Sequence, residues 1–393
     1  MPYTTESGPE NVVTIKVVGV GGAGNNVVNR MVKSGTQGIE YVAINTDKQA
    51  LAVSSADQKI QIGEKLTHGQ GAGSDPETGK RSAEESRNNI AKSLENADMV
   101  FITAGMGGGT GTGAAPTIAD IAREAGILTV AVVTKPFKFE GKRRMDQALV
   151  GINELLGKVD SLLIIPNDRL KYATDQKVTL ANAFEIADDV LRQAVTSISD
   201  LIKNTGFINL DFADVTCIMK DAGFAHMGVG HAAGKGKAED AARMAVASPL
   251  METSINGARG VLINITGSED MGLEDVETAA NLVQEAAHPD ANIIFGASFD
   301  PSLDDEIRVT VIATGFEDPA KAEEPAPAAQ QQSAPRAQTG FYTAATDLRA
   351  SAPAAPAQTA APAAPAAPAA PAQPAAPAEE DPFDSIFKIF NSK

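Results

Sequence analysis

Short apolar runs alternate with longer amphipathic stretches over residues 12–167. The apolar runs are VTIKVVGV, EYVAINTD, DMVFITAG, ILTVAVVT and DSLLIIPN, and the stretches between them include RSAEESRNNIAKSLENA and GAAPTIADIAREAG. Strands that are apolar on both faces are typical of a parallel sheet covered by helices on each side. The pattern therefore predicts a Rossmann-like α/β domain, whose ligands bind in the loops at the carboxyl ends of the strands.

One segment, residues 178–203, is apolar at steps of three and four along its whole length. This period predicts a single amphipathic helix of about 25 residues. A second α/β pattern follows it, with the runs GVLINITG, LEDVETAANLVQEAA, NIIFGASF and EIRVTVIATG. We therefore expect a second, smaller α/β domain over residues 223–317, joined to the first by the long central helix.

The composition changes sharply after residue 317. Residues 318–378 are rich in Ala and Pro and carry almost no large apolar side chain, which predicts a disordered, extended linker. The last segment, residues 379–393, regains aromatic residues. Four of its apolar positions fall at i, i+3, i+4 and i+7, namely Phe383, Ile386, Phe387 and Phe390. A short helix with one apolar stripe and no core of its own favours docking to a partner over an idle tail.

Charge and composition exclude several classes of protein. The net charge is −17 and the basic residues form no long block, which argues against a nucleic-acid surface. No apolar signal segment and no window of 18 apolar residues is present, so we expect a cytoplasmic protein without direct membrane insertion. The single cysteine, Cys217, lies in the apolar stretch DVTCIM and is expected to be buried. The four histidines are scattered, and no metal-ligating residues are predicted.

Two glycine-rich segments follow predicted strands. In the first, Gly19, Gly21 and Gly24 match G-x-G-x-x-G, and Asp47 follows at the end of the next apolar run, as in a dinucleotide site. The second, GMGGGTGTG, contains six glycines from position 105 to position 113 and precedes a helix expected to open at Ala114–Pro116. Glycines let backbone N–H groups converge on an anion, and a helix N-terminus adds positive charge. The second segment therefore predicts a phosphate cradle.

A third glycine-rich segment, GQGAGSDPETGK, lies between these two. Several such loops at strand ends indicate a longer polyphosphate held from several sides. A Walker A loop is excluded, because Ser74 stands where its first glycine is required and Arg81 stands where Ser or Thr should follow the lysine. Phosphate binding is therefore expected to depend on backbone amides.

The second loop and its surroundings resemble the tubulin/FtsZ family, and in particular its bacterial cell-division GTPases. The matching blocks include GVGGAGNN, VAINTD, GAGSDPE, VFITAGMGGGTGTGAAP, VVTKPFKFEGK, IPND, NLDFADV and GARGVLINITG, and they span nearly all of residues 12–317. The resemblance implies a tubulin-like fold, GTP or GDP with Mg²⁺, and head-to-tail protofilaments. It also implies a role in the mid-cell division ring, with residues 379–393 binding membrane-tethering division proteins.

The expected organisation is a flexible tail (1–11), a GTP-binding domain (12–177), the central helix (178–203), an acidic catalytic loop and helix (204–222), the C-terminal α/β domain (223–317), the linker (318–378) and the partner-binding peptide (379–393). The predicted nucleotide contacts are Gly21, Gly22, Ala23, Gly24, Asn25, Asn26, Ala72, Gly73, Gly105, Gly107, Gly108, Gly109, Thr110, Gly111, Glu140, Arg144, Phe184 and Asp188. The catalytic residues that the resemblance implies are Asn209, Asp211 and Asp214.

Phe184 and Asp188 lie four residues apart on the predicted central helix, so they share one face. An aromatic ring stacks on a purine, and a carboxylate accepts from guanine N1–H and its 2-amino group, a pair that adenine does not offer. The residues alone leave Asp188 open as a surface carboxylate, and the resemblance makes it the guanine-reading position. The resemblance also places Asn26 on the nucleotide, and Glu140 and Arg144 near the ribose, with a solvated charge run as the alternative.

Asp211 and Asp214 open a predicted helix, where an N-cap and a first-turn acid are the simpler interpretation of the residues alone. The resemblance makes them the acids that polarise the attacking water. Asp188 and Asp211 then lie at opposite ends of one helix, about 21 Å of helical rise apart, and cannot meet on one γ-phosphate within a chain. We therefore predict that one molecule's acidic loop completes the next molecule's site, and that such contacts repeat into a filament.

Two other functions stay open at this point. One is a Rossmann-type oxidoreductase that binds NAD, which the first glycine segment alone would support. The other is a tubulin-like filament GTPase with a role in plasmid partition or cell shape. The C-terminal peptide DPFDSIFKIFNSK departs from the proline-containing apolar motif usual in the family, which leaves the identity of its tether open.

Overall fold

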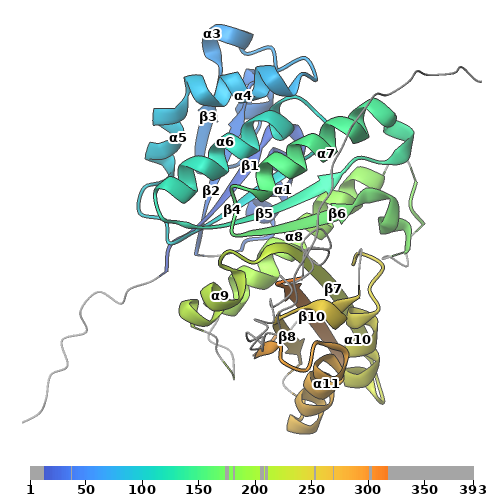
Figure 1. The fold of residues 1–393 in the computed structure, drawn as a ribbon. Helices are drawn as coiled ribbons and strands as arrows, with labels where there is room; N and C mark the ends of the chain where they lie inside the picture. Colours follow the sequence, from blue (N-terminus) through green and yellow to red (C-terminus); the bar gives the residue numbers. More distant parts are fainter. Residues whose placement is uncertain are drawn as a thin grey trace, which may run out of the picture. The chain divides into compact units, whose positions relative to one another are not determined.

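The computed structural model describes residues 13–36, 38–172, 177–179, 182–203, 208, 211–251, 254–268, 270–300 and 303–316 (Figure 1). All of them belong to one compact unit, Met1–Pro327. The predictions for the N-terminal tail, the Ala/Pro linker and the C-terminal peptide concern residues outside this described part.

A single ten-stranded sheet runs through this unit, in the order β3-β2-β1-β4-β5-β6-β7-β10-β8-β9. The strands are β1 (Ile15–Val20), β2 (Ile39–Asn45), β3 (Gln58–Gln61), β4 (Met99–Gly105), β5 (Leu128–Lys135), β6 (Ser161–Pro166), β7 (Gly223–Ala233), β8 (Gly260–Gly267), β9 (Asn292–Phe299) and β10 (Glu306–Thr314). Neighbours from β3 to β7 are parallel, as are β8 and β9, whereas β10 is antiparallel to both β7 and β8. The mostly parallel α/β sheet predicted from the apolar runs is confirmed.

Helices cover both faces of the β1–β6 part of the sheet. On one face, α1 (Gly21–Lys33), α2 (Lys48–Ala52) and α8 (Ala183–Lys203) share a core with β1, β2 and β4. On the other face lie α4 (Pro76–Glu85), α5 (Arg87–Leu94), α6 (Thr110–Glu124) and α7 (Lys142–Leu156). The remaining helical elements are α3 (Glu64–Thr67), η1 (Lys138–Glu140), η2 (Asn167–Tyr172), α9 (Phe212–Met219), α10 (Lys237–Val246), η3 (Ile255–Gly257) and α11 (Leu273–Ala286). None of the helices in the described part is long and apolar enough to span a bilayer.

The central helix α8 lies between the β1–β6 part of the sheet and strands β7–β10 (Figure 1). It begins at Ala183 rather than at Val178, which corrects the predicted start. Thr179 and Asn182 form a turn before it, in which the Asn182 amide nitrogen donates to Thr179 Oγ1 (3.4 Å) and the Ala183 nitrogen donates to the Thr179 carbonyl (2.9 Å). This turn begins the helix, because such side chains satisfy first-turn N–H groups.

Strand β7 and helix α10 are two elements that the apolar pattern did not reveal. Two glycines interrupt β7, and each lies against the backbone of α10. A methyl group built on Gly228 would lie 1.9 Å from the Ala245 carbonyl oxygen, and one on Gly230 would lie 2.0 Å from that of Ala241. Glycine within a strand often marks such a close backbone approach. Because Gly228 and Gly230 have no side chain, the backbone of α10 can contact β7 at these positions.

Two further expectations are wrong. Helix α6 starts at Thr110, so Pro116 lies in its second turn and not at its opening. Cys217 is exposed rather than buried, since the short helix α9 turns Val215, Ile218 and Met219 inward and leaves the thiol on its outer face.

Candidate nucleotide site

Helices α1 and α6 begin where the order of strands reverses. Strand β1 pairs with both β2 and β4, and from β4 onward the chain builds the sheet in the opposite direction. In doubly wound sheets this reversal point is where ligands bind. The N-cap residues of these helices in the described part of the chain are Val20 for α1 and Gly109 for α6, and neither makes a side-chain capping hydrogen bond. Their first amides therefore stay available to an anion, and both helix dipoles favour negative charge there.

Glycine is required at different positions of the first segment for different structural reasons. Gly21 starts α1 at a φ of +72°, and a methyl group on it would lie 3.0 Å from the amide nitrogen of Gly111 in α6. Gly24 is a packing glycine, because a methyl group there would lie 2.2 Å from the Thr103 carbonyl oxygen. Gly19 packs in turn against Gly24, since a methyl group built on Gly19 would lie 2.4 Å from the Gly24 carbonyl oxygen. These contacts bring the two helix N-termini side by side.

At Gly22 and Gly108, in contrast, neither packing against the described residues nor backbone conformation requires glycine. A methyl group on either would meet no atom within 4 Å, and neither has a left-handed φ. Nothing in the described part of the chain therefore requires glycine at these two positions. A side chain there would instead project into the open space beside the two helix N-termini. This cradle fits a polyphosphate approaching the backbone closely.

The third segment closes the same site from another side. A methyl group on Gly109 would lie 2.8 Å from Ala72 Cβ and 2.9 Å from the amide nitrogen of Asp75, so the two loops touch. Gly73 has a φ of +60°, and Asp75 caps α4 by accepting from the Glu77 and Thr78 amides. The predicted contacts Ala72 and Gly73 are thereby brought beside the second loop.

Thr112, which the sequence reasoning did not single out, holds the second loop in place. Its Oγ1 accepts from the amide nitrogen of Gly107 at 2.8 Å, and Gly107 has a φ of +97°. The Gly107 amide is thereby already used within the protein. Gly105 lies next to Ala23, since a methyl group on it would be 2.8 Å from Ala23 Cβ.

The two asparagines of the first segment face different ways. Asn25 is buried and, with its amide oriented to satisfy both groups, donates to the carbonyls of Gly19 (2.8 Å) and Gly21 (3.2 Å) and accepts from Asn45 Nδ2 (3.1 Å). Asn26 is exposed. The side chain of Asn25 thus stabilises the turn, whereas that of Asn26 is accessible to a ligand.

Asp47, the acid that completed the dinucleotide pattern, caps α2. Its Oδ1 accepts from the amides of Gln49 (2.8 Å) and Ala50 (3.2 Å). In a dinucleotide site this carboxylate would bind the ribose hydroxyls. Its use as a helix cap therefore argues against the oxidoreductase alternative.

Three aromatic rings cluster beside the start of α8. Phe184 is 47% exposed and meets Phe137 edge-on, with ring centroids 5.5 Å apart, and Phe139 stacks on Phe137 at 5.1 Å. Phe139 is itself 61% exposed. The sequence reasoning found Phe184 but missed the other two, whose signal was the spacing in PFKFEGK.

Asp188 lies one turn after Phe184 and is only 8% exposed. The pKa of its carboxyl is raised to about 7, mainly by burial; the charge of Arg30 lowers this pKa, and the charge of Glu185 raises it. The Arg30 guanidinium is 3.8 Å away (Nε to Oδ2), too far for a hydrogen bond. A buried carboxylate with unused acceptor capacity is suited to a ligand that donates hydrogen bonds.

Glu140 and Arg144 pair with each other across one turn, between η1 and α7. Glu140 also accepts from the Phe137 amide at 2.9 Å, which fixes the aromatic cluster to η1. The carbonyl of Arg144 lies beside Gly107, where a methyl group would be 2.7 Å from it. The pair therefore lies between the aromatic rings and the second glycine loop.

The acidic residues lie at the other end of α8. Asp211 and Asp214 form a capping box on α9, with the Asp214 amide donating to Asp211 Oδ1 (2.7 Å) and the Asp211 amide donating to Asp214 Oδ2 (3.3 Å). Ile208 forms a two-bond bridge with Ala297 of the edge strand β9. Asn209 lies outside the described residues. Both carboxylates thus have the structural role that the residues alone favoured, and Asp211 remains exposed.

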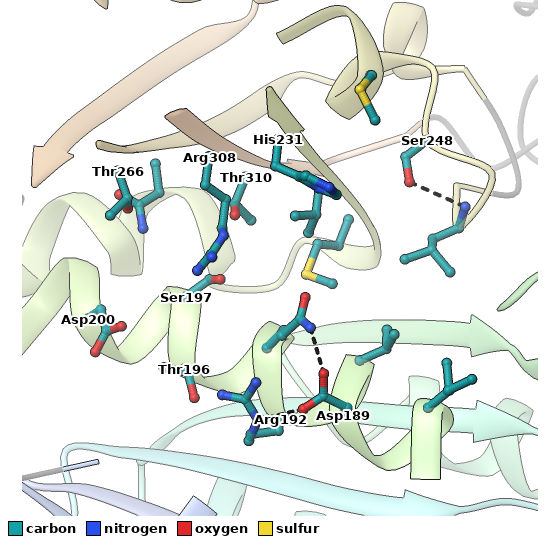
Figure 2. A pocket seen from close by; sticks show the side chains of 18 of the residues that line it. Asp189, Arg192, Thr196, Ser197, Asp200, His231, Ser248, Thr266, Arg308 and Thr310 are labelled. Atoms are coloured by element: carbon teal, nitrogen blue, oxygen red, sulfur yellow. Dashed lines mark hydrogen bonds and ion pairs between the residues drawn. The ribbon is translucent and has the colours of Figure 1, made fainter. Parts of the chain in front are cut away.

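A large cleft of about 1140 Å³ lies on a different face of α8, toward strands β7, β8 and β10 (Figure 2). Asp189 borders it and accepts hydrogen bonds from Arg192 Nε and Gln193 Nε2, each at 2.8 Å. None of the predicted nucleotide contacts is among the described residues that line this cleft. The cleft is therefore a separate feature from the loops that carry the predicted nucleotide contacts.

Comparisons with known proteins agree with this arrangement. Residues 14–175 match the GTPase domain of the Tubulin/FtsZ family, and residues 223–317 match the C-terminal domain of the FtsZ family. An FtsZ dimer from M. jannaschii, described as empty, is 45% identical with a TM-score of 0.75, over 77% of this chain and 88% of that chain. CetZ2 from Haloferax volcanii, described as a GTPγS-bound protofilament, shares the fold at 21% identity and a TM-score of 0.66, over 78% and 94% of the two chains.

A mostly parallel sheet with glycine loops at its reversal point, which continues past one long helix into a second α/β part, defines the tubulin-like class of GTPases. Within that class, the chain belongs to the Tubulin/FtsZ family, with FtsZ-type domains in both parts. The resemblance and the fold class inferred from the sequence are thereby confirmed.

Proposed function

We propose that this protein hydrolyses GTP at the contact between consecutive subunits of a head-to-tail filament, and that the filament forms the bacterial division ring. The observation that carries the proposal is the separation of Asp188 from Asp211. From Asp188 to Lys203, the end of α8, the helix rises about 22 Å, and Asp211 follows only after a further connection. A base bound at Asp188 and water activated by Asp211 therefore belong to different molecules.

Exposed apolar side chains at both ends of α8 support such a contact. Phe139 and Phe184 lie beside the base site. Next to the acidic end, Ile208 pairs with Ala297, which lies on β9 between the exposed rings of Phe295 and Phe299. Two unlike surfaces that complement each other form a heterologous interface, which repeats without closing.

The chemistry in this proposal is mainly positioning and electrostatics. The first amides of α1 and α6 bind the phosphates, and Asp188 accepts from guanine. Asp211 and Asp214 of the neighbouring subunit, with Asn209, orient water toward the γ-phosphate and hold its proton. Mg²⁺ neutralises phosphate charge when bound. The described residues contain no carboxylate cluster for it, and Mg²⁺ often takes its ligands from phosphate oxygens and water.

The test is the GTPase rate as a function of protein concentration, with light scattering recorded in parallel. A shared site predicts that hydrolysis and scattering both vanish below one threshold concentration. Hydrolysis per molecule that stays constant down to the lowest concentration would contradict a site between subunits.

A mixing experiment tests directly whether two molecules each contribute part of one active site. An Asp211→Ala protein keeps its base site, and an Asp188→Ala protein keeps its acidic end. Each alone is expected to be nearly inactive, and their mixture is expected to recover part of the activity. Absence of recovery at every ratio would contradict the shared site.

We further propose that residues 379–393 bind the proteins that tether the filament to the membrane. The proposal rests on the apolar stripe of Phe383, Ile386, Phe387 and Phe390. A chain shortened to residue 378 should still polymerise and hydrolyse GTP, but should no longer be recruited to the division site. Equal recruitment with and without the peptide would contradict this role.

A further inference from the structure

Thr46 connects two of the phosphate loops, although no motif singled it out. It follows β2 directly and is fully buried. Its carbonyl accepts from the amide nitrogen of Gly71 (3.2 Å) and from Thr67 Oγ1 (3.3 Å). The backbone of Thr46 thereby fixes the start of the loop that contains Ala72 and Gly73.

The side chain of Thr46 reaches the other loop. Its Oγ1 lies 2.7 Å from Oγ1 of Thr110, the first residue of α6. Thr110 is partly exposed, and its neighbour Gly111 lies against Gly21 of α1. The Thr110 hydroxyl is thus located where the two helix N-termini and the cradle of Gly22 and Gly108 meet.

The direction of this hydrogen bond follows from the ligand. A hydroxyl has one proton to donate, and a phosphate oxygen only accepts. Thr110 can therefore bind a phosphate only by donating its own proton, and its oxygen must then accept from Thr46. Hydrogen bonds to charged acceptors are the stronger ones, and a chain of hydrogen bonds polarises each member.

We propose that Thr46 is a positioning residue for the nucleotide: its hydroxyl donates to Thr110 Oγ1 and so orients the Thr110 proton toward a phosphate. The inference rests on the proposed binding of GTP phosphates at the N-terminus of α6. Thr46 itself is too deeply buried to touch the ligand, so its effect is transmitted through Thr110.

The experiment measures the dissociation constants of GTP and GDP for the full-length protein by titration calorimetry. Thr46→Val removes the hydroxyl at nearly constant volume, and we expect about tenfold weaker binding of both nucleotides. Thr46→Ser restores the hydroxyl and should bind within about twofold of the wild type. All three side chains leave the carbonyl of residue 46 in place.

Thr129→Val is the matched control. Thr129 is also fully buried, and its hydroxyl donates to the Ile127 carbonyl (2.9 Å) near the amino end of β5, the opposite edge of the sheet from the phosphate loops. The Thr129→Val substitution should lower thermal stability about as much as Thr46→Val does, while leaving nucleotide affinity unchanged. Should Thr46→Val not fold, Thr46→Ala removes the hydroxyl without a branched replacement and takes its place.

A double-mutant cycle tests whether the effect passes through Thr110. In a Thr110→Val background, Thr46→Val should weaken binding no further. The inference is overturned if Thr46→Val binds like the wild type, if Thr46→Ser loses as much as Thr46→Val, or if the two losses add in the double variant. A wild-type protein that binds no GTP would instead overturn the proposed function, before any variant is compared.

Discussion

Arg30 and Asp188 face each other between α1 and α8 at 3.8 Å, close enough to attract but not to form a hydrogen bond. Because Asp188 is buried, desolvation outweighs this attraction and raises the pKa of the carboxyl to about 7. Asp188, the residue proposed to read the base, is therefore about half protonated at neutral pH when the site is empty. Guanine, which donates to a carboxylate, favours the ionised form.

The first prediction is that GTP affinity depends on pH through Asp188. Below about pH 7 the empty site holds a proton that guanine binding must release, so affinity rises with pH, by up to about tenfold per unit, and levels off above the pKa. The same raised pKa makes the empty protein lose stability as pH increases from about 4 to about 7, since the folded chain retains a proton that the unfolded chain releases. Calorimetric titrations across this range measure the first effect.

Arg30→Gln provides the matched variant for this pH dependence. Arg30 lowers the pKa of Asp188, so its removal should raise that pKa and move the plateau of GTP affinity to higher pH. The γ-phosphate also titrates in this range, and an Asp188→Asn protein reports that contribution alone. Identical pH profiles for the wild type and Asp188→Asn would contradict the assignment to Asp188.

The second prediction concerns specificity for the base. Asn at position 188 keeps one acceptor for the N1–H group but presents an N–H donor to the 2-amino group of guanine. Xanthine carries an oxygen in place of that amino group. Asp188→Asn should therefore lower GTP affinity by at least about tenfold and raise XTP affinity relative to the wild type. Competition between GTP and XTP measures the switch, and an unchanged preference would contradict the base-reading role.

The parallel sheet could be predicted because its strands are continuous apolar runs separated by amphipathic stretches. Strand β7 could not be recognised in this way, because Gly228 and Gly230 replace apolar side chains where α10 approaches. The start of α6 was also missed. Thr110, Gly111, Thr112 and Gly113 are poor helix formers, and three of them are buried, so tertiary contacts rather than propensity hold this turn.

The glycine loops and the Phe184–Asp188 pair could be found because their signals are local spacings. Phe137 and Thr46 were missed because their importance lies in contacts with Phe184 and Thr110, which are distant in the sequence. Thr112 was missed because nothing in the sequence marks its hydrogen bond to the Gly107 amide, five residues away. The sequence also does not distinguish a glycine needed for packing from one needed for a ligand. Gly22 and Gly24 lie two residues apart in one glycine-rich segment, yet their surroundings are opposite.

This contrast gives the third prediction. Gly24→Ala places a methyl group 2.2 Å from the Thr103 carbonyl oxygen, so it should lower the free energy of unfolding by about 1–3 kcal/mol. Gly22→Ala meets no protein atom and lies in a helix, where Ala is favoured by up to about 1 kcal/mol. It should leave stability unchanged or higher while weakening GTP binding at least about tenfold. Thermal unfolding and nucleotide titration of the two variants, taken together, test the cradle. Full GTP affinity in Gly22→Ala would exclude it.

The fourth prediction separates the two roles of Asp211. Its side chain caps α9 by accepting from the Asp214 amide at 2.7 Å, and Asn caps helices about as well as Asp does. The free energy of unfolding of Asp211→Asn should therefore lie within about 0.5 kcal/mol of the wild-type value, whereas that of Asp211→Ala should be lower by about 1 kcal/mol. If the carboxylate also holds the proton of the attacking water, both variants should lose about 100-fold or more in GTP hydrolysis. GTP binding should not change in either, because the proposed base site at Asp188 is at the other end of α8. An Asp211→Asn protein that hydrolyses GTP at the wild-type rate would leave Asp211 with its capping role alone and would require another group to activate the water.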